Sequence, residues 1–446
     1  MHHYHHILTS DLSATMSSSF VSLANDMKHD INKHQAADRQ NQILLPESVI
    51  TMLTDLFEKK NYSMVMKIAL SFLEENQRSI FLLNILGETA SILSHQEEAI
   101  SYFERLIDCE PYSGEIHRKK EFLPNVYHNL SILKKDLGFL DEAEIYVKKA
   151  IKLNPDFQNA YNTFGTILND KANIAGAKVN LLKAIDINPL DHIPYWNLQS
   201  TASNLQEACQ ILERCLEQAP AFEKGVITLA GLKAFLGDRS HFDLLKKSDL
   251  KKSPLMRSID WVLSLPIMPE IHFNRWSVFD RAVEWSDRNR PFYEFGVWMG
   301  DSFKYLMHSY DTGYGFDTFV GLPEQWRTVP KGTYSSYGFI PEIIGGNFIA
   351  GKFNDTLPIF FEKTRPLASI INFDADLYSS TKTALNYSAS VIDEKTILIF
   401  DEFIVNPEWE MDEYRALNEF CKAKCINYEV LAVSLFTKQV VCRLSS

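Results

Sequence analysis

The sequence predicts an all-α repeat solenoid followed by a doubly wound α/β domain built on a mostly parallel sheet. Pro155 and Pro189 are 34 residues apart, a spacing typical of stacked helical repeats. From Phe292 onwards, short apolar runs alternate with helical segments, the pattern of strands joined by helical crossovers. Two of these runs, Ile370–Phe373 and Ile397–Phe400, are followed directly by carboxylates. The chain therefore divides into a helical front half and an α/β back half.

The composition limits the class of partner. Of 446 residues, 46% are hydrophobic and 23% are charged, which is typical of a globular protein with two or three domains. The formal net charge of −12 argues against nucleic acid or an anionic membrane surface as the main partner. No apolar window approaches the length of a membrane span, and no signal-peptide pattern is present. We therefore expect a cytoplasmic protein with no membrane span.

The N-terminal residues and the cysteines are not expected to form a binding or catalytic site. Residues 1–42 are polar and irregular, and we expect a disordered tail there. The six cysteines show neither a disulfide framework nor the two pairs of ligands that a zinc site needs, so we expect reduced, structural thiols. These cysteines are Cys109, Cys209, Cys215, Cys421, Cys425 and Cys442.

Residues 43–240 are predicted to form an array of tetratricopeptide repeats. The 34-residue period is that of this repeat, in which small and aromatic residues recur at fixed offsets and allow two antiparallel helices to approach closely. Three registers agree, counted back from Pro111, Pro155 and Pro189. The expected packing positions are Gly87, Ala99 and Phe103; Tyr127, Leu130, Ala143 and Ala150; and Tyr161, Phe164, Gly165, Ala177, Leu181 and Ala184.

The repeat array favours a role in recognition. A stack of helical repeats presents a concave groove, which fits a protein partner or self-association. The alternative is a rigid scaffold that only positions the second domain. Residues 241–288 are predicted to be a lysine-rich linker and bridging helices, with Trp261, Trp276, Phe279 and Trp285 packing against the next domain.

The α/β domain, residues 289–446, begins with a strand, a glycine turn and a helix start. Gly296 and Gly300 lack Cβ atoms, so the backbone can approach a ligand closely. Ser302 follows near the helix N-terminus, where free N–H groups favour an anion or a carboxylate. Asp317 ends the next strand, 23 residues after Glu294, and an acid in this place commonly binds the ribose hydroxyls of an adenosine-bearing cofactor.

Two cofactors are compatible with a glycine turn. A dinucleotide site would show the spacing G-x-G-x-x-G, which would favour an NAD-dependent oxidoreductase. This chain instead has an acid, Glu294, before Gly296, and that carboxylate would repel a pyrophosphate but attract a cationic group. The pattern therefore favours S-adenosylmethionine, which carries an amino group and a sulfonium.

Carboxylates cluster at the ends of the two buried strands. Asp374 and Asp376 follow one, and Asp401 and Glu402 follow the other. The carboxyl ends of strands are where open α/β sheets bind ligands. Because four converging carboxylates repel one another, the pattern predicts a divalent metal ion. For Asp376, a cap or surface ion pair is as good an interpretation as a role in the site.

Residues 291–446 resemble the macrocin O-methyltransferase family, which belongs to the class I, S-adenosylmethionine-dependent enzymes with a Rossmann-like fold. Five motifs appear in order, and the repeats lie outside the resemblance. They are Glu294-Phe295-Gly296-Val297 with Gly300 and Ser302, Phe316-Asp317-Thr318-Phe319-Val320-Gly321-Leu322-Pro323, Gly351-Lys352-Phe353-Asn354-Asp355-Thr356-Leu357-Pro358, Asp374-Ala375-Asp376-Leu377-Tyr378-Ser379-Ser380-Thr381, and Asp401-Glu402-Phe403.

The resemblance implies Mg²⁺-assisted methyl transfer to a hydroxyl of a sugar-containing acceptor, either a glycan or a natural product. It places the metal on Asp374, Asp401 and Glu402, with Asp374 also as the general base. The cofactor-binding residues are then Glu294, Gly296, Gly300, Ser302, Asp317 and Phe353. The family usually has two aspartates where this chain has Asp401-Glu402, which leaves open whether Glu402 binds the metal.

Two other interpretations concern the loops and the overall role. The aromatic, Gly- and Pro-rich stretch between Pro323 and Gly351 is predicted to be a substrate lid, since long irregular segments in compact domains are often functional. The main alternative to an active enzyme is a tetratricopeptide interaction scaffold whose methyltransferase domain binds cofactor without turning over.

Overall fold

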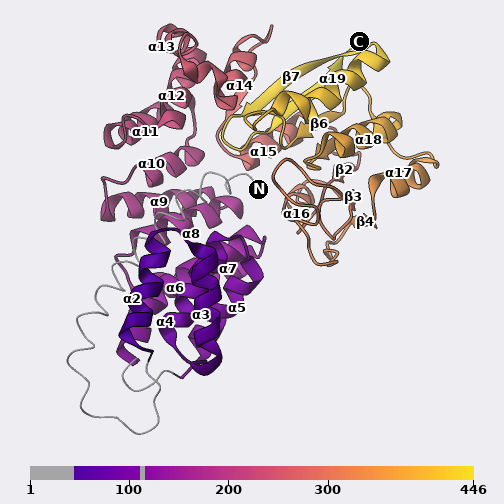
Figure 1. Cartoon of the computed structure of the whole chain (residues 1–446). Coiled ribbons are helices and arrows are strands. Elements are labelled where there is room, and N and C mark those ends of the chain that lie inside the picture. Colours follow the sequence, from indigo (N-terminus) through magenta and orange to yellow (C-terminus); the bar gives the residue numbers. More distant parts are fainter. Residues whose placement is uncertain (1–44, 111–115, 446) are drawn as a thin grey trace. The chain divides into compact units, whose positions relative to one another are not determined.

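A computed structural model describes residues 45–110 and 116–445, and the chain folds into two compact units, Met1–Asn188 and Pro189–Ser446 (Figure 1). The predicted tail at residues 1–42 lies outside the described residues. The described part of the first unit is all-α. Its helices are α2 (Glu47–Glu58), α3 (Tyr62–Glu75), α4 (Ile80–Ile92), α5 (Gln96–Asp108), α6 (Ile116–Asp136), α7 (Leu140–Leu153), α8 (Gln158–Asp170) and α9 (Ile174–Ile187).

Small residues bring the paired helices of the first unit together, as the repeat pattern predicts. A Cβ atom on Gly87 in α4 would lie 2.6 Å from the ring of Phe103 in α5. A Cβ atom on Gly165 in α8 would lie 2.6 Å from Cγ of Leu181 in α9. Neither position therefore accepts a larger side chain without moving its neighbour. The predicted alanines Ala99, Ala143, Ala150, Ala177 and Ala184 are all fully buried.

A buried carboxyl group makes the stability of the first unit depend on pH. Glu88 in α4 is 2% exposed and accepts a hydrogen bond from Asn84 Nδ2 at 3.1 Å. Burial raises the pKa of Glu88 to about 8, and the bond from Asn84 only partly offsets the shift. A raised pKa in the folded state stabilises the fold at low pH, and this contribution is lost as the pH rises towards 8.

We therefore expect Glu88→Gln to stabilise the protein at alkaline pH. The amide cannot ionise, so the variant avoids a loss of about 3 kcal/mol between about pH 5 and pH 8. Calorimetric unfolding of the full chain at both pH values measures this difference. Glu97→Gln, an exposed position on α5, is the matched control and should change little. An equal effect of Glu88→Gln at both pH values would contradict the assignment.

The second unit begins with helices, the first of which contacts the turn between two late strands, β7 and β8. Trp196 in α10 lies 5.0 Å from Phe436, measured between ring centroids. A Cβ atom on Gly231 in α12 would lie 2.7 Å from Ile259 in α14, so these helices also approach closely. The division between packed units at residue 188 thus precedes residue 240, where the sequence places the end of the repeats. The helices are α10 (His192–Leu198), η3 (Gln199–Thr201), α11 (Leu205–Gln218), α12 (Glu223–Phe235), α13 (Ser240–Leu245), η4 (Asp249–Lys252), α14 (Pro254–Leu263) and α15 (Arg275–Trp285).

An eight-stranded mixed sheet forms the centre of the second unit. Its order is β1-β7-β8-β6-β5-β2-β3-β4, in which β8 is antiparallel to both neighbours and the other pairs are parallel. The crossover direction changes between β2 and β5, which is where ligands bind in open α/β sheets. The strands are β1 (Glu270–His272), β2 (Phe292–Phe295), β3 (Gly313–Asp317), β4 (Gly346–Ala350), β5 (Ile370–Phe373), β6 (Ile397–Phe400), β7 (Asn427–Ser434) and β8 (Val440–Ser445).

Both edge strands correct the sequence prediction. β1 lies in the segment predicted to be linker and bridging helices, where it pairs with β7. β4 falls in the predicted lid, yet it pairs with β3 over its whole length. Both edge strands are partly exposed along their length, so they lack the fully buried run that marks β2, β5 and β6. The predicted packing is confirmed for three of the four aromatic residues: the ring centroids of Trp276 and Phe279 lie 4.5 and 6.2 Å from that of Tyr305, and that of Trp261 lies 5.7 Å from that of Phe403.

A row of stacked phenyl rings sets the register of the four central strands. Phe316, Phe295, Phe373 and Phe400 belong to β3, β2, β5 and β6, and successive ring centroids lie 5.0, 5.5 and 4.8 Å apart. They are partners in the sheet, so the residue after each ring lies at the carboxyl edge. The remaining elements are α16 (Asp301–Leu306), α17 (Phe353–Phe361), α18 (Tyr378–Ser388), η5 (Ala389–Val391), η6 (Trp409–Met411) and α19 (Glu413–Lys424).

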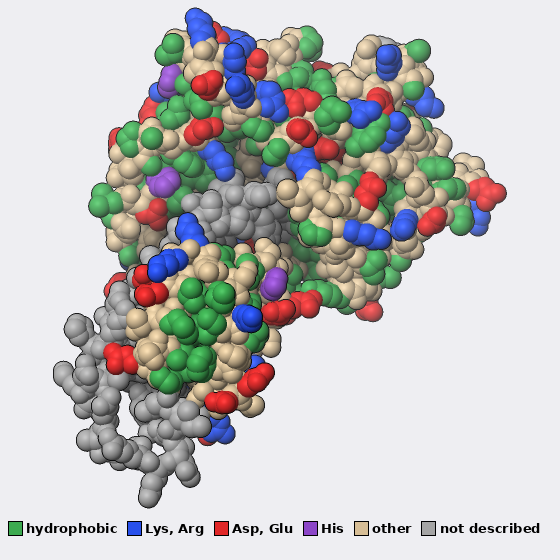
Figure 2. Space-filling model, in the orientation of Figure 1, with side chains coloured by type: hydrophobic (Ala, Val, Ile, Leu, Met, Phe, Trp, Pro, Cys, Tyr) green, Lys and Arg blue, Asp and Glu red, His purple; other side chains and the backbone are tan. Residues whose placement is uncertain are grey.

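The surface charges, the helices and the thiols of the described residues can be compared with the composition. Figure 2 shows basic and acidic side chains interspersed on the face in view, without a large basic patch. None of the helices in the described part of the chain is long and apolar enough to cross a membrane. All six cysteines lie within the described residues and are free thiols.

Candidate active site

The carboxyl edge of the sheet gathers four of the predicted site residues. Gly296, Asp317, Asp374 and Asp401 each follow one of the stacked phenylalanines directly. Their closeness is therefore a consequence of strand register and does not depend on loop conformation. This edge lies at the β2–β5 crossover change, so the structure brings the predicted cofactor residues and the predicted carboxylates to one place.

The turn after β2 requires glycine. Gly296 has φ +94°, and a Cβ atom there would lie 1.8 Å from the carbonyl oxygen of Asp374. The backbones of the two strand ends are thus in direct contact. Gly300, with φ +83°, precedes α16, and Ser302 in the first turn of that helix is buried.

Asp317 holds the glycine turn through backbone hydrogen bonds. Its Oδ2 accepts from the N–H groups of Val297 at 2.7 Å and Trp298 at 2.8 Å, and its Oδ1 accepts from Phe319 N–H at 2.8 Å. The carboxylate therefore orders both loops around the predicted cofactor position. Phe353, the first residue of α17, lies with its ring 5.7 Å from that of Phe295.

Glu294 is a buried carboxyl group with an unused oxygen. Asn372 Nδ2 donates to its Oε1 at 2.7 Å, and its Oε2 has no hydrogen-bond partner among the described residues. Burial raises the pKa of Glu294 to about 8, although Ser302 and Asn372 lower it in part. A buried, unsatisfied acceptor is costly unless a ligand satisfies it, which indicates a cationic or hydrogen-bond-donating ligand.

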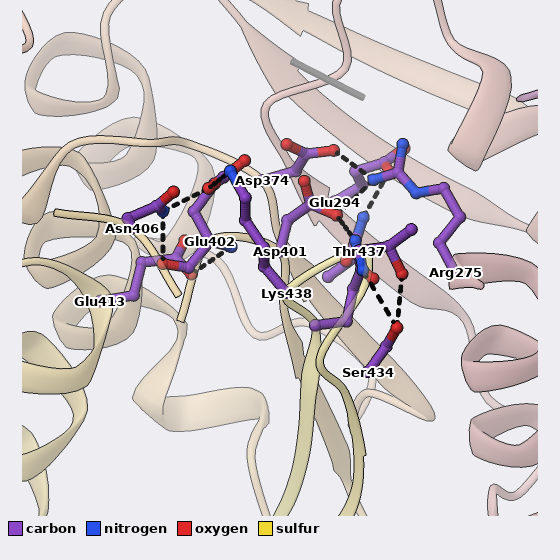
Figure 3. A network of polar contacts seen from close by, with 12 residues as sticks. Arg275, Glu294, Asp374, Asp401, Glu402, Asn406, Glu413, Ser434, Thr437 and Lys438 are labelled. Atoms are coloured by element: carbon purple, nitrogen blue, oxygen red, sulfur yellow. Dashed lines mark hydrogen bonds and ion pairs between the residues drawn. The ribbon is translucent and has the colours of Figure 1, made fainter. Parts of the chain in front are cut away.

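Arg275 joins two of the predicted metal ligands (Figure 3). Its Nη2 donates to Asp374 Oδ2 at 3.3 Å and also binds Asp401 Oδ1. Gln439 Nε2 donates to the same Asp401 oxygen at 2.5 Å. Burial and the Asp401 carboxylate raise the pKa of Asp374 to about 7, against the effect of Arg275. Burial alone would raise the pKa of Asp401, but Arg275 holds it below its usual range.

Glu402 faces a second buried cation. Lys438 Nζ donates to Glu402 Oε2 at 3.1 Å, and Asn406 Nδ2 binds the same oxygen (Figure 3). The Glu402 N–H donates to Glu413 Oε2 at 2.9 Å. Burial lowers the pKa of Lys438, whereas Glu402 and Asp401 raise it. The longer side chain of Glu402 thus reaches a lysine.

The carboxylates do not fit the predicted magnesium site in this arrangement. Mg²⁺ needs free oxygen ligands in an octahedron. Here Asp374 and Asp401 share a guanidinium, and Glu402 is bound by an ammonium and an amide. Within residues 45–110 and 116–445, no three His, Cys, Asp or Glu side chains form a group that would hold a metal ion. Magnesium therefore stays a prediction from the sequence alone.

Four residues that contact the predicted site residues escaped the sequence prediction. Asn372 interrupts the apolar run of β5, and a polar residue in a strand buried on both faces is a signal that could have found it. Arg275, Lys438 and Gln439 have no such signal. Arg275 precedes the predicted domain, and the other two lie in or beside the turn between β7 and β8, so only the fold brings them to the carboxylates.

The loop after β3 covers the glycine turn. Trp298 Nε1 donates to Ser335 O at 3.3 Å, and the rings of Trp298 and Tyr334 are 6.5 Å apart. Burial raises the pKa of Tyr334, and the nearby Asp376 and Glu402 carboxylates add to the shift. In contrast, Tyr337 and Phe339 are each 58% exposed. The predicted lid therefore has an inner face on the site and an exposed aromatic rim.

One family match supports the repeats, and several solved structures are similar to parts of the chain. Residues 124–157 match the family described as tetratricopeptide repeat. One similar solved structure is TTC0263, a thermophilic TPR protein in Thermus thermophilus, with 18% identity over 42% of this chain and 98% of that chain and a TM-score of 0.33. Another is Pseudomonas aeruginosa PilF, with 13% identity over 45% of this chain and 90% of that chain and a TM-score of 0.38. The structure of the O-methyltransferase NovP is also similar, with 18% identity over 39% of this chain and 80% of that chain and a TM-score of 0.29. No curated protein sequence matches the chain.

Proposed function

We propose that the second unit is a Rossmann-like class I methyltransferase, which transfers a methyl group from S-adenosylmethionine to a hydroxyl of a sugar-containing acceptor. The observation that carries this proposal is the pairing of a buried acid, Glu294, with the glycine turn at Gly296 beside Asp374. The parallel part of the sheet, in the order β4-β3-β2-β5-β6, supports the fold assignment.

The residues present suit this cofactor. The unused Oε2 of Glu294 would accept from the cationic amino group of S-adenosylmethionine. Asp317, which already orders the glycine turn, would accept from a ribose hydroxyl in place of the long hydrogen bond that Thr318 Oγ1 donates to its Oδ1 at 3.4 Å. Gly300, Ser302 and Phe353 would line the rest of the cofactor site. The turn has the spacing Gly296-x-x-x-Gly300 where a dinucleotide site would show G-x-G-x-x-G, which disfavours the oxidoreductase alternative.

The chemistry needs one base and correct alignment. When bound, S-adenosylmethionine would supply a methyl group on sulfur, and the sulfur would keep the electron pair of the carbon–sulfur bond. Asp374 would accept the proton of the acceptor hydroxyl, whose oxygen would form the new bond to the methyl carbon. The Gly296–Asp374 backbone contact fixes the distance between the cofactor turn and the base, which favours in-line attack.

Two features support the acceptor class and the role of the first unit. The exposed rings of Tyr337 and Phe339 at the lid rim suit stacking on sugar rings. The tetratricopeptide stack would bind a protein partner or a second copy of the chain through its groove. The alternative, an inactive scaffold, retains cofactor binding and differs only in the absence of turnover.

The pKa of Glu294 leads to a test of cofactor binding. Because burial raises the pKa of Glu294 to about 8, binding of a cationic ligand requires loss of its proton. We expect the affinity for S-adenosylmethionine to rise with pH, by up to about tenfold per unit below the pKa. Titration calorimetry in buffers of different ionisation enthalpy measures both the affinity and the proton released.

Glu294→Gln should remove the pH dependence of binding. The amide cannot ionise, and loss of the charge-assisted bond should weaken binding about 10- to 100-fold at alkaline pH. Glu362→Gln, at an exposed position after α17, is the control. A wild-type affinity that falls with rising pH would contradict this role of Glu294.

A further inference from the structure

We propose that the side-chain cations Arg275 and Lys438 take the place of a divalent metal ion at the carboxyl edge of the sheet, and that the transferase acts without one. This inference rests on the proposed function. It starts from the carboxylates that the sequence predicts as metal ligands, Asp374, Asp401 and Glu402, each of which is bound by a cationic side chain of the same unit.

Arg275 is held in this position by the structure around it. The preceding residue, Asn274, accepts from Ser277 N–H at 2.9 Å to begin α15 and donates to Ser200 O at 2.9 Å. The guanidinium lies 5.8 Å from the ring centroids of both Trp276 and Phe279. The residue is 6% exposed. Withdrawal of Arg275 to admit a metal ion would therefore disturb the start of the helix and its aromatic neighbours.

The arginine satisfies the electrostatic requirement that a metal would satisfy. The Nη2 atom of Arg275 contacts both Asp374 and Asp401, so a positive charge lies between the two carboxylates. The neighbouring acids keep Arg275 charged despite its burial, because they raise its pKa. Gln439 completes the contacts of Asp401 Oδ1. Arg275 is thus a positioning residue, which fixes the carboxylates and acts through Asp374.

Lys438 has the same relation to Glu402. The ammonium reaches Glu402 Oε2 at 3.1 Å from a residue that is 8% exposed. Asn406 binds the same oxygen from the other side (Figure 3). Glu402, which departs from the aspartate expected there, has the extra methylene that this contact uses. Both cations come from outside the five family motifs.

The test is Mn²⁺ binding to the full-length protein, followed by electron paramagnetic resonance. We expect Arg275→Ala to bind Mn²⁺ with an apparent affinity at least about tenfold higher than that of wild type, because two buried carboxylates lose their cation. Arg275→Lys restores the charge and should again exclude Mn²⁺. Arg281→Ala is the matched control, because Arg281 also lies in α15 and pairs with two carboxylates, Glu270 and Glu284, but at the surface.

Several outcomes overturn the proposal. Mn²⁺ binding by wild type as tight as by Arg275→Ala would show that the arginine gives way to a metal ion. If neither protein binds Mn²⁺, Arg275 does not occupy a position that a metal ion would otherwise take. If Arg275→Ala does not fold, the wild-type titration still decides, and recovery of folded variant by added Mn²⁺ supports the proposal. S-adenosylmethionine binding, measured on the same wild-type sample, separates failure of this inference from failure of the proposed function.

Discussion

Gly296→Ala is expected to destabilise the second unit by about 3–5 kcal/mol and to abolish measurable binding of S-adenosylmethionine. The new Cβ atom would lie 1.8 Å from the carbonyl oxygen of Asp374, so the ends of β2 and β5 must move apart. That movement separates the cofactor turn from the base. Thermal unfolding and ligand titration of the variant measure the two effects.

Gly237→Ala separates the steric effect from the backbone effect. Gly237 has φ +102°, close to the value at Gly296, but a Cβ atom there meets nothing within 4 Å. The control should lose only about 1–2 kcal/mol, the cost of a positive φ for a residue with a side chain. Equal losses in the two variants would mean that the strand contact contributes nothing beyond backbone strain.

Asp374→Asn is expected to lower methyl transfer by about 10²- to 10⁴-fold, because the amide cannot accept the proton of the acceptor hydroxyl. The side-chain shape is retained, and the backbone contact with Gly296 is unchanged. Cofactor affinity should therefore stay close to that of wild type. Transfer of labelled methyl from S-adenosylmethionine to a glycan or metabolite extract measures activity, and calorimetry measures binding.

Asp355→Asn, at an exposed position in the first turn of α17, is the control for this variant and should transfer methyl groups normally. Full activity of Asp374→Asn would remove Asp374 as the base. A parallel loss of activity and cofactor affinity would instead give Asp374 a role in binding. Absence of transfer by a wild-type protein that binds the cofactor would favour the inactive scaffold.

The spacing of the helical repeats and the apolar runs of the buried strands predicted much of this structure from the sequence. Gly87 and Gly165 lie at the repeat positions expected of them, since close helix packing leaves no room for a larger residue. The apolar runs of β2, β5 and β6 predicted the central strands, and register then aligned the acids that follow. In contrast, β1 and β4 escaped prediction because edge strands carry no continuous apolar signal.

The electrostatics of the site could not be read from the sequence. Converging carboxylates require a compensating cation, and the sequence pattern cannot distinguish a metal ion from a side chain brought in by the fold. Arg275 lies 99 residues before Asp374, and Lys438 lies 36 residues after Glu402. Neither pairing is visible before the helices and the final hairpin are placed on the sheet.

Titration calorimetry of the full chain with S-adenosylmethionine, and separately with NAD, tests the central claim most directly. The proposed function predicts that S-adenosylmethionine binds at one site per chain, more tightly at alkaline than at acidic pH, and that NAD does not bind. Absence of S-adenosylmethionine binding, or binding of NAD in its place, would contradict it.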